Sequence, residues 1–506
     1  MSIQPEQSIT RPSIAESSKW VFAGTLLSKP IQLATNVFLA RLLGPASFGV
    51  LGLATSLAVT LSLIAGMGLG DASYKYVAEY YRSDKVRGAR MASVIVWSTT
   101  SISAMVFLTM WLLRSFWVPK VFPSSVPSMV IALCLTLAWM NLLFAVLNGI
   151  FAGLQHFRDF TILNLLQAIA LAGLAFTLGF GGTVVGALLA YVLGSALSIV
   201  WGLAKVFRSD RSIIGWPGLA SFRELKRMLH FSAPIWIGSF ALTPVVTFTF
   251  VLLARQPGGD SQLGIFNTAN GLRMLIVILP SVIATVITPA LIQEGGVSGD
   301  KDSFRSLLDK SFAAMALATI PLLIICLFFA DLLLSIYGKA YAGSFRLFMP
   351  LVAAAGVGAV GAPLVTVMMA KNKTWWSLAF GFFKSLLLVV LCLWWVPGYL
   401  ATGLAWAFFF SEISFYLIAL EFCIQANTLS AQLRSTFYSS IVAIGLLLIM
   451  ALWLPSGLRW FLAIPLMIVA VVYILRSQEN LAKWLPNMVP PALQPRAERL
   501  LGLIAS

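Results

Sequence analysis

The sequence predicts an all-α polytopic membrane protein with about 14 transmembrane helices, and two observations support this prediction. Hydrophobic residues make up 59% of the 506 residues and charged residues only 10%, with a mean hydropathy of +0.92. This leaves too little polar surface to cover a water-soluble globule of this size. The apolar runs are also about 20 residues long, the length with which a helix crosses a hydrocarbon core roughly 30 Å thick.

Each predicted span ends at charged or polar turns. We expect spans at 19–40, 50–70, 91–113, 128–153, 160–180, 183–205, 233–254, 265–292, 312–333, 347–369, 375–396, 399–424, 437–454 and 460–475. The residues before Lys19 are polar, with no short apolar core and cleavage site, so we expect the first span to be an uncleaved anchor.

A duplication organises the chain. The stretch from Gly24 to Arg41 recurs 214 residues later, from Gly238 to Arg255, with seven identities in eighteen positions. Composition alone would give roughly two or three, so we interpret the match as a repeat. A one-residue insertion carries the match onward and sets Gly49 against Gly264. Because six spans separate the copies, the two halves have the same orientation, as in parallel repeats about an axis along the membrane normal.

The repeat defines the predicted domains. Residues 19–206 form an N-lobe of six helices and residues 233–424 a C-lobe of six, and the last two spans, 437–475, are an appended pair without a repeat partner. A cytoplasmic segment (1–18), a cytoplasmic linker between the lobes (207–232) and a cytoplasmic tail (476–506) complete the chain.

The basic residues set the expected orientation. If the N-terminus is cytoplasmic, 24 of the 34 Lys and Arg residues lie on that side and only seven on the other. This bias places both termini inside. It also accounts for the formal charge of +16 without nucleic acid, since no basic surface domain exists. Anionic lipids are the expected partners of the inner loops.

Ionisable residues inside spans are costly and point to function. Thr25, Lys29, Gln32 and Asn36 form a single polar stripe on span 1, which should face an interior and not lipid. Alternatively, the side chain of Lys29 extends along the helix so that its ammonium group reaches water, or it pairs with a carboxylate elsewhere.

Span 8 offers a similar polar edge in the other half. Asn267, Asn270 and Arg273 follow at intervals of three. If both edges face the cleft between the lobes, Lys29 and Arg273 line a cavity suited to an anionic head group with hydroxyl-rich substituents. Alternatively, the amides only hold helices together.

A third cation and the proline pair complete the candidate residues. Lys384 is a further candidate for substrate binding, but Glu412 lies at comparable depth on the next span, so an internal ion pair is an equal alternative. In the functional alternative, Glu412 gains and loses a proton or binds a coupling cation during transport. Pro30 and Pro244, which recur in both halves, are the candidate hinges.

Enzyme and channel functions find little support. The two histidines show no metal-ligand or triad spacing, and there is no phosphate-binding glycine loop and no large external loop on which to build an active site. We therefore expect no catalytic residue, no metal and no cofactor. Nothing in the sequence indicates a re-entrant filter or a multimeric ring, and we expect a monomer.

The segment from Phe38 to Gly49, with Ala40-Arg41-Leu42-Leu43-Gly44-Pro45 at its centre, resembles the signature that follows the first span of polysaccharide-export flippases. The segments Gly66–Ala72 and Val77–Tyr81 are similar to that family's second span and inner loop. The resemblance is collinear through residue 424. It points to the oligosaccharidyl-lipid and polysaccharide exporter branch of the superfamily that also contains multidrug and toxin extruders.

The resemblance implies a V-shaped bundle of two lobes in a bacterial inner membrane. It also implies flipping of polyprenyl-pyrophosphate-linked oligosaccharides by alternating access, for O-antigen, capsule or exopolysaccharide assembly, with a polysaccharide polymerase and a chain-length regulator as expected partners. Basic residues on the first and eighth helices of such flippases would here be Lys29 and Arg273. Two alternatives stay open: a cation-coupled multidrug exporter of the same superfamily, and a non-transporting scaffold for polysaccharide synthesis.

Overall fold

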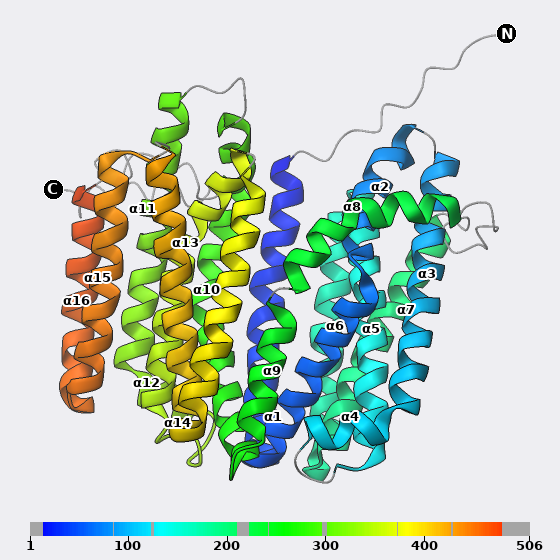
Figure 1. The fold of residues 1–506 in the computed structure, drawn as a ribbon, viewed down its shortest axis with the longest axis horizontal. Coiled ribbons are helices and arrows are strands. Elements are labelled where there is room, and N and C mark those ends of the chain that lie inside the picture. Colours follow the sequence, from blue (N-terminus) through cyan, green and yellow to red (C-terminus); the bar gives the residue numbers. More distant parts are fainter. Residues whose placement is uncertain are drawn as a thin grey trace.

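All regular secondary structure is helical in the part of the chain that the computed structural model describes. This part comprises residues 14–83, 85–122, 126–209, 222–240, 242–295, 301–371, 373–426 and 429–477. The helices stand side by side, and α1 begins at the same face at which α16 ends (Figure 1). The predicted all-α membrane fold is thus confirmed. Most of the predicted terminal segments 1–18 and 476–506, and residues 210–221 of the predicted linker, lie outside the described residues.

The first group of helices is the N-lobe. It contains α1 (Ile14–Gly66), α2 (Leu69–Ser83), α3 (Lys85–Leu112), α4 (Arg114–Val121), α5 (Ser128–Gly153), α6 (Phe157–Leu178), η1 (Gly179–Gly181) and α7 (Val184–Ser209). The C-lobe contains α9 (Thr243–Ala254), α10 (Gly259–Gly295), α11 (Lys301–Phe328), α12 (Ala330–Ser335), α13 (Phe345–Ala370) and α14 (Thr374–Gln425). The connecting helix is α8 (Phe222–Phe240), and the appended hairpin is α15 (Ala431–Trp453) and α16 (Ser456–Ser477).

Within the described residues, twelve helices are long and apolar enough to cross a membrane. Two of them, Trp20–Gly66 with 47 residues and Thr374–Gln425 with 52 residues, are about twice as long as one crossing requires. Each contains a residue outside helical geometry, Gly44 at φ 71° and Leu400 at φ 50°. The predicted count of about 14 spans, which divides each of these helices in two, stays a prediction.

The seventh predicted span, 233–254, is not one continuous helix. Helix α8 ends at Phe240 and α9 begins at Thr243, with Pro244 in its first turn. Proline is well placed there because it has no N–H to donate to a preceding turn. The side chains of Trp236 and Ser232 donate hydrogen bonds of 2.9 and 2.8 Å to N-lobe carbonyls at Leu63 and Met67. Helix α8 therefore lies on the N-lobe (Figure 1), whereas Pro30 lies inside the continuous helix α1.

The two lobes meet where the second half of α1 crosses α10, and the contacts there are reciprocal. A Cβ atom on Gly49 would overlap the carbonyl oxygen of Asp260, and a Cβ on Gly264 would overlap the carbonyl oxygen of Pro45. The sequence repeat pairs Gly49 with Gly264, and the same offset pairs Pro45 with Asp260. Each lobe thus makes the same contact on the other, as expected around a pseudo-twofold axis.

Gly52 and Asn267 identify the position of that axis. They are equivalent in the repeat, and a Cβ on Gly52 would overlap the side chain of Asn267, so two equivalent positions contact each other. Gly49 on α1 contacts Asp260 on α10, and Gly52, further along α1, contacts Asn267, further along α10. The two helices therefore run parallel. This is the arrangement predicted from the duplication, and small residues permit such a close approach of helices.

The last identity of the repeat, Arg41 and Arg255, has a structural explanation. Each arginine donates a hydrogen bond to a carbonyl of the opposite lobe. The carbonyl lies after α11 and α12 for Arg41, and after α3 for Arg255. Arg41 Nε donates to the Ile336 carbonyl at 2.6 Å, and Arg255 donates to the Pro119 carbonyl at 3.5 Å. Beside Arg41, the hydroxyl of Tyr341 donates to the Ala40 carbonyl at 2.9 Å, and burial raises the pKa of Tyr341 to about 12, so the donor keeps its proton.

We expect Arg41→Ala to lower the free energy of unfolding by about 1 kcal/mol, because it removes a short hydrogen bond from a guanidinium group between the lobes. Its repeat partner supplies the matched control: Arg255→Ala should change stability by less than about 0.5 kcal/mol, because that hydrogen bond is longer, at 3.5 Å against 2.6 Å. Thermal unfolding of both variants in the same detergent measures the difference. Equal losses of stability would contradict the expectation that Arg41 contributes more than Arg255.

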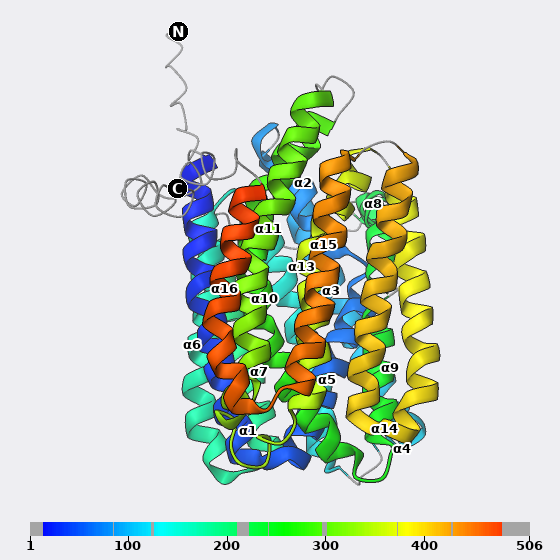
Figure 2. The same cartoon turned by 90° about the vertical axis from the view of Figure 1, so that its left-hand side faces the viewer.

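The appended hairpin packs against α11 and α13 (Figure 2). Arg459 on α16 anchors it, since its side chain is 4% exposed and forms an ion pair of 2.6 Å with Asp331 on α12. Between α11, α15 and α16 lies a mainly apolar groove of about 490 Å³, with Ser435, Thr436, Ser439 and Ser440 among its lining residues.

Candidate functional site

The N-lobe contains a cavity of about 240 Å³, which we call the N-lobe cavity. Four helical segments each supply two lining residues spaced four apart, so that both side chains lie on one helix face. These pairs are Gln32 and Asn36, Thr55 and Val59, Leu137 and Asn141, and Tyr191 and Ser195. Helix α6 adds Gln167, Ala168 and Leu171. The predicted residues Gln32 and Asn36 are thereby brought together, from the first half of α1.

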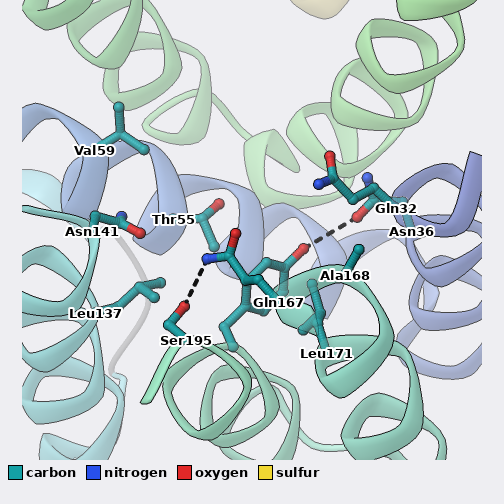
Figure 3. Close-up of a pocket in the computed structure, with 11 residues that line it drawn as sticks. Gln32, Asn36, Thr55, Val59, Leu137, Asn141, Gln167, Ala168, Leu171 and Ser195 are labelled. Carbon is teal, nitrogen blue, oxygen red and sulfur yellow. Dashed lines mark hydrogen bonds between the residues drawn. The ribbon is translucent and has the colours of Figure 1, made fainter. Parts of the chain in front are cut away.

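Amides and hydroxyls dominate the polar lining of the N-lobe cavity, and hydrogen bonds hold some of them in place. Gln167 donates to the hydroxyl of Ser195 at 3.1 Å (Figure 3), and the hydroxyl of Tyr191 donates to the side-chain oxygen of Asn36 at 3.2 Å. Thr55 donates to the carbonyl of Gly52, one turn earlier, at 3.1 Å. None of the eleven lining residues carries a charge, so the cavity can offer hydrogen bonds in both directions without a fixed charge.

Lys29 lies beside the N-lobe cavity and not in its lining. Its side chain is exposed, and its ammonium group donates to the side-chain oxygen of Gln32 at 3.5 Å. Within the stripe predicted on span 1, Lys29 contacts Gln32, whereas Thr25 donates to the carbonyl of Val21 within α1. An ammonium group consequently stands one helical turn from the amides of the cavity.

The C-lobe holds a second polar group of residues, the C-lobe charge cluster of Arg273, Lys384 and Glu412. Lys384 and Glu412 form an ion pair of 2.6 Å with side chains 15% and 17% exposed, and the ammonium group of Lys384 lies 5.4 Å from the centre of the Phe415 ring. Helix α13 approaches Glu412 closely at Gly358, where a Cβ atom would lie 3.0 Å from a carboxylate oxygen.

Arg273 extends the charge cluster from α10. It lies within electrostatic range of Glu412, and its Nε is buried without a hydrogen-bond partner among the described residues. One carboxylate thus faces two cations, which leaves one net positive charge. Because Lys384 takes the direct contact with Glu412, Arg273 is the cation of this group with a donor still to be satisfied.

The remaining predicted amides lie elsewhere. Asn267 packs on Gly52 at the pseudo-twofold axis, and its side-chain nitrogen is buried without a partner among the described residues. Asn270 is half-buried on α10. Neither residue lines the N-lobe cavity, and neither does Arg273. The N-lobe cavity and the C-lobe charge cluster are therefore separate groups, one neutral and one charged.

Five polar lining residues of the N-lobe cavity were not predicted from the sequence: Thr55, Asn141, Gln167, Tyr191 and Ser195. Asn141 and Gln167 could have been predicted from the sequence, because each is an amide within an apolar span, as Gln32 is. The three hydroxyl residues carried none, since serine and threonine commonly bond to their own helix in membrane spans.

Among the described residues, no group of three or more His, Cys, Asp or Glu residues comes together that could hold a metal ion.

Two solved structures share this fold. A structure of the lipid II flippase MurJ in an inward closed conformation superposes with a TM-score of 0.70 at 13% identity, covering 90% of this chain and 99% of that one. An inward-facing multidrug resistance MATE family transporter of the MOP superfamily superposes with a TM-score of 0.65 at 15% identity, covering 84% and 98%. At these identities the likeness shows the fold alone.

Curated relatives and a family model show the family. A Shigella flexneri protein named as a candidate O-antigen transporter is 23% identical over 65% of this chain and 78% of its own length. The lipid III flippase of Escherichia coli is 28% identical over 37% of this chain, a match that spans 45% of the flippase. The model of the polysaccharide biosynthesis protein family matches residues 14–294, more than half of the chain. The chain therefore belongs to the polysaccharide biosynthesis protein family, whose named relatives here are transporters and flippases.

Proposed function

We propose that this protein is a flippase that moves polyprenyl-pyrophosphate-linked oligosaccharides across the bacterial inner membrane by alternating access, for O-antigen, capsule or exopolysaccharide assembly. One observation carries the proposal: a neutral cavity of amides and hydroxyls stands beside the ammonium group of Lys29, and the opposite lobe holds a charge cluster with one net positive charge. Such a substrate combines sugar hydroxyls with a pyrophosphate anion, and the two groups of residues match these two parts.

The proposed roles follow from the chemistry of each residue. Lys29 and Arg273 neutralise the pyrophosphate, with Lys384 as a further cation when Glu412 releases it. Gln32 and Asn36 hydrogen-bond sugar hydroxyls from the N-lobe cavity, and Asn267 and Asn270 meet the glycan once the lobes separate. Glu412 is the candidate group for ion coupling, and Pro30 and Pro244 are the candidate hinges.

The contacts between the lobes support a cycle of alternating access. The distribution of basic residues favours a cytoplasmic position for the start of α1 and the end of α16. The glycine crossing and the hydrogen bonds of Arg41 and Arg255 then lie toward the outer face. In this conformation the outer side is closed, and outward opening requires these contacts to break.

Complementation tests the proposal in bacterial cells that lack their own flippase. Lys29→Ala and Arg273→Ala should each abolish surface polysaccharide while the protein is still made at wild-type level, because each removes a cation that the pyrophosphate needs. Lys339→Ala and Arg208→Ala, at cations away from both candidate sites, should leave the polymer unchanged. Normal polymer from both Lys29→Ala and Arg273→Ala would refute the assignment.

A multidrug exporter is the second candidate, because the chain shares the fold of a MATE family transporter. Such a protein would require anionic groups for cationic drugs, whereas the N-lobe cavity has no charge and the only carboxylate of the C-lobe charge cluster is paired with Lys384. Drug resistance that depends on Glu412 would support this candidate. A scaffold for polysaccharide synthesis, the third candidate, would tolerate the neutralisation of Lys29 and Arg273.

A further inference from the structure

We infer that the N-lobe cavity binds one uncharged sugar residue of the glycan, such as a neutral hexose or an N-acetylhexosamine, and that it discriminates against acidic sugars. The inference rests on the proposed function, because it assigns one part of the proposed substrate to one place in the molecule. It also names a selectivity that the flippase assignment alone does not contain.

The size of the cavity limits what it can hold. The N-lobe cavity has a volume of about 240 Å³. It is smaller than the pockets of roughly 300–1,000 Å³ that enclose drug-sized ligands. One sugar ring fits such a space, and a chain of sugar rings does not.

The polar groups are arranged to meet hydroxyl groups. Asn36 uses its oxygen to accept from Tyr191, so its amide nitrogen remains to donate. Gln167 uses its nitrogen to donate to Ser195, so its amide oxygen remains to accept. Asn141 reaches the cavity from the opposite wall, and its amide can do both (Figure 3). A sugar hydroxyl is both donor and acceptor, and it pairs with either kind of group.

The apolar part of the lining suits the other surface of a sugar. Val59, Leu137 and Leu171 lie among the polar residues, where they can cover the C–H groups of a pyranose ring. A site with only polar groups would compete poorly with water, because each hydrogen bond to the ligand replaces one to solvent. A mixed lining removes apolar area from water as well.

The absence of charge among the lining residues provides the discrimination. The carboxylate of a uronic acid would exchange part of its water for the cavity lining and find no cation among the eleven lining residues, and the partial desolvation of an unpaired charge is unfavourable. Lys29 is not one of these lining residues, and its exposed ammonium group is already engaged with the side-chain oxygen of Gln32 at 3.5 Å. Binding of an uncharged sugar involves no comparable desolvation of a charge.

Direct binding to the purified full-length protein tests the inference with three probes: farnesyl pyrophosphate, farnesyl pyrophosphate carrying N-acetylglucosamine, and the same lipid carrying glucuronic acid. We expect the neutral sugar to tighten binding relative to the bare lipid, and the acidic probe to bind about tenfold or more weaker than the neutral one. Gln167→Lys, which brings a cation into the cavity, should erase or reverse this preference.

Thr55→Val tests the site with a smaller change. It should weaken binding of the neutral probe several-fold and leave bare farnesyl pyrophosphate unchanged. Thr177→Val is the matched control, because Thr177 also bonds to its own helix but does not line the cavity; it should change neither affinity.

The outcomes separate the two proposals. Equal affinities for the neutral and acidic probes, or a Thr55→Val variant that binds like wild type, would overturn the inference while leaving the flippase assignment intact. Failure of bare farnesyl pyrophosphate to bind the wild-type protein would instead count against the proposed recognition of pyrophosphate by Lys29 and Arg273.

Discussion

Glu412→Ala is expected to destabilise the protein by about 3–5 kcal/mol, because it leaves the mostly buried ammonium group of Lys384 without its counter-charge. The two side chains are 15% and 17% exposed and form a 2.6 Å ion pair, and Arg273 adds a second cation near the same carboxylate. Chemical unfolding of the purified protein in detergent measures the loss.

A double variant separates a structural role of this pair from a role in transport. Lys384→Met combined with Glu412→Gln removes both charges, so it should recover most of the stability lost in Glu412→Ala. If Glu412 titrates or binds a coupling ion, or if Lys384 binds the substrate, the stable double variant will still fail to complement a flippase-deficient strain. If the pair is only structural, polysaccharide export will return.

Glu421→Gln is the matched control for Glu412. Glu421 lies on the same helix, α14, but its side chain is exposed and its neighbour is an amide, Gln425. Its substitution should change stability by less than about 0.5 kcal/mol. A Glu412→Ala variant as stable as Glu421→Gln would show that Lys384 is solvated and would contradict the buried pair.

Gly264→Leu is expected to abolish export and to destabilise the closed interface between the lobes. Even a single added Cβ atom would overlap the carbonyl oxygen of Pro45, so α1 and α10 would have to separate. Overpacking of a rigid contact costs about 1–3 kcal/mol or more. Because main-chain atoms form the contact, no side-chain rotation can relieve the clash. Surface polysaccharide and thermal stability are the two measurements.

The repeat supplies an internal check on the glycine crossing. Gly49→Leu should have a similar effect, because Gly49 makes the equivalent contact on Asp260. Gly445→Leu on α15 is the control, since a Cβ atom there has no other atom within 4 Å. Wild-type stability and export in Gly264→Leu would show that the lobes do not meet closely along these helices.

Much of the fold could be predicted because helices in a membrane must satisfy their own backbone hydrogen bonds and must be long enough to cross. The break between α8 and α9 shows a limit of such prediction. Pro30 and Pro244 are equivalent in sequence, yet only Pro244 begins a new helix. Proline removes one hydrogen bond in either case, and the difference lies in α8, which the carbonyls of Leu63 and Met67 hold on the N-lobe.

The candidate site shows a second limit. Gln32 and Lys29 stood out because a polar side chain in an apolar helix is costly. Asn141 and Gln167 are equally polar, but their helices offer no neighbouring charge to suggest a site. Their role as lining residues depends on the arrangement of α5 and α6 around α1. The spacing of residues within a single helix does not predict this arrangement.

The sequence by itself determined that this chain crosses a membrane as helices, that its halves are parallel copies, and which face of α1 is polar. Helical periodicity and the cost of burying polar groups are sufficient for these conclusions. Only the tertiary structure decided that Lys384 pairs with Glu412 and that four amides from three helices converge on one cavity. The physical reason is that a helix determines which side chains share a face, whereas distances between helices depend on how closely and in what register they cross. Here Gly49, Gly52 and Gly264 set that approach between the lobes.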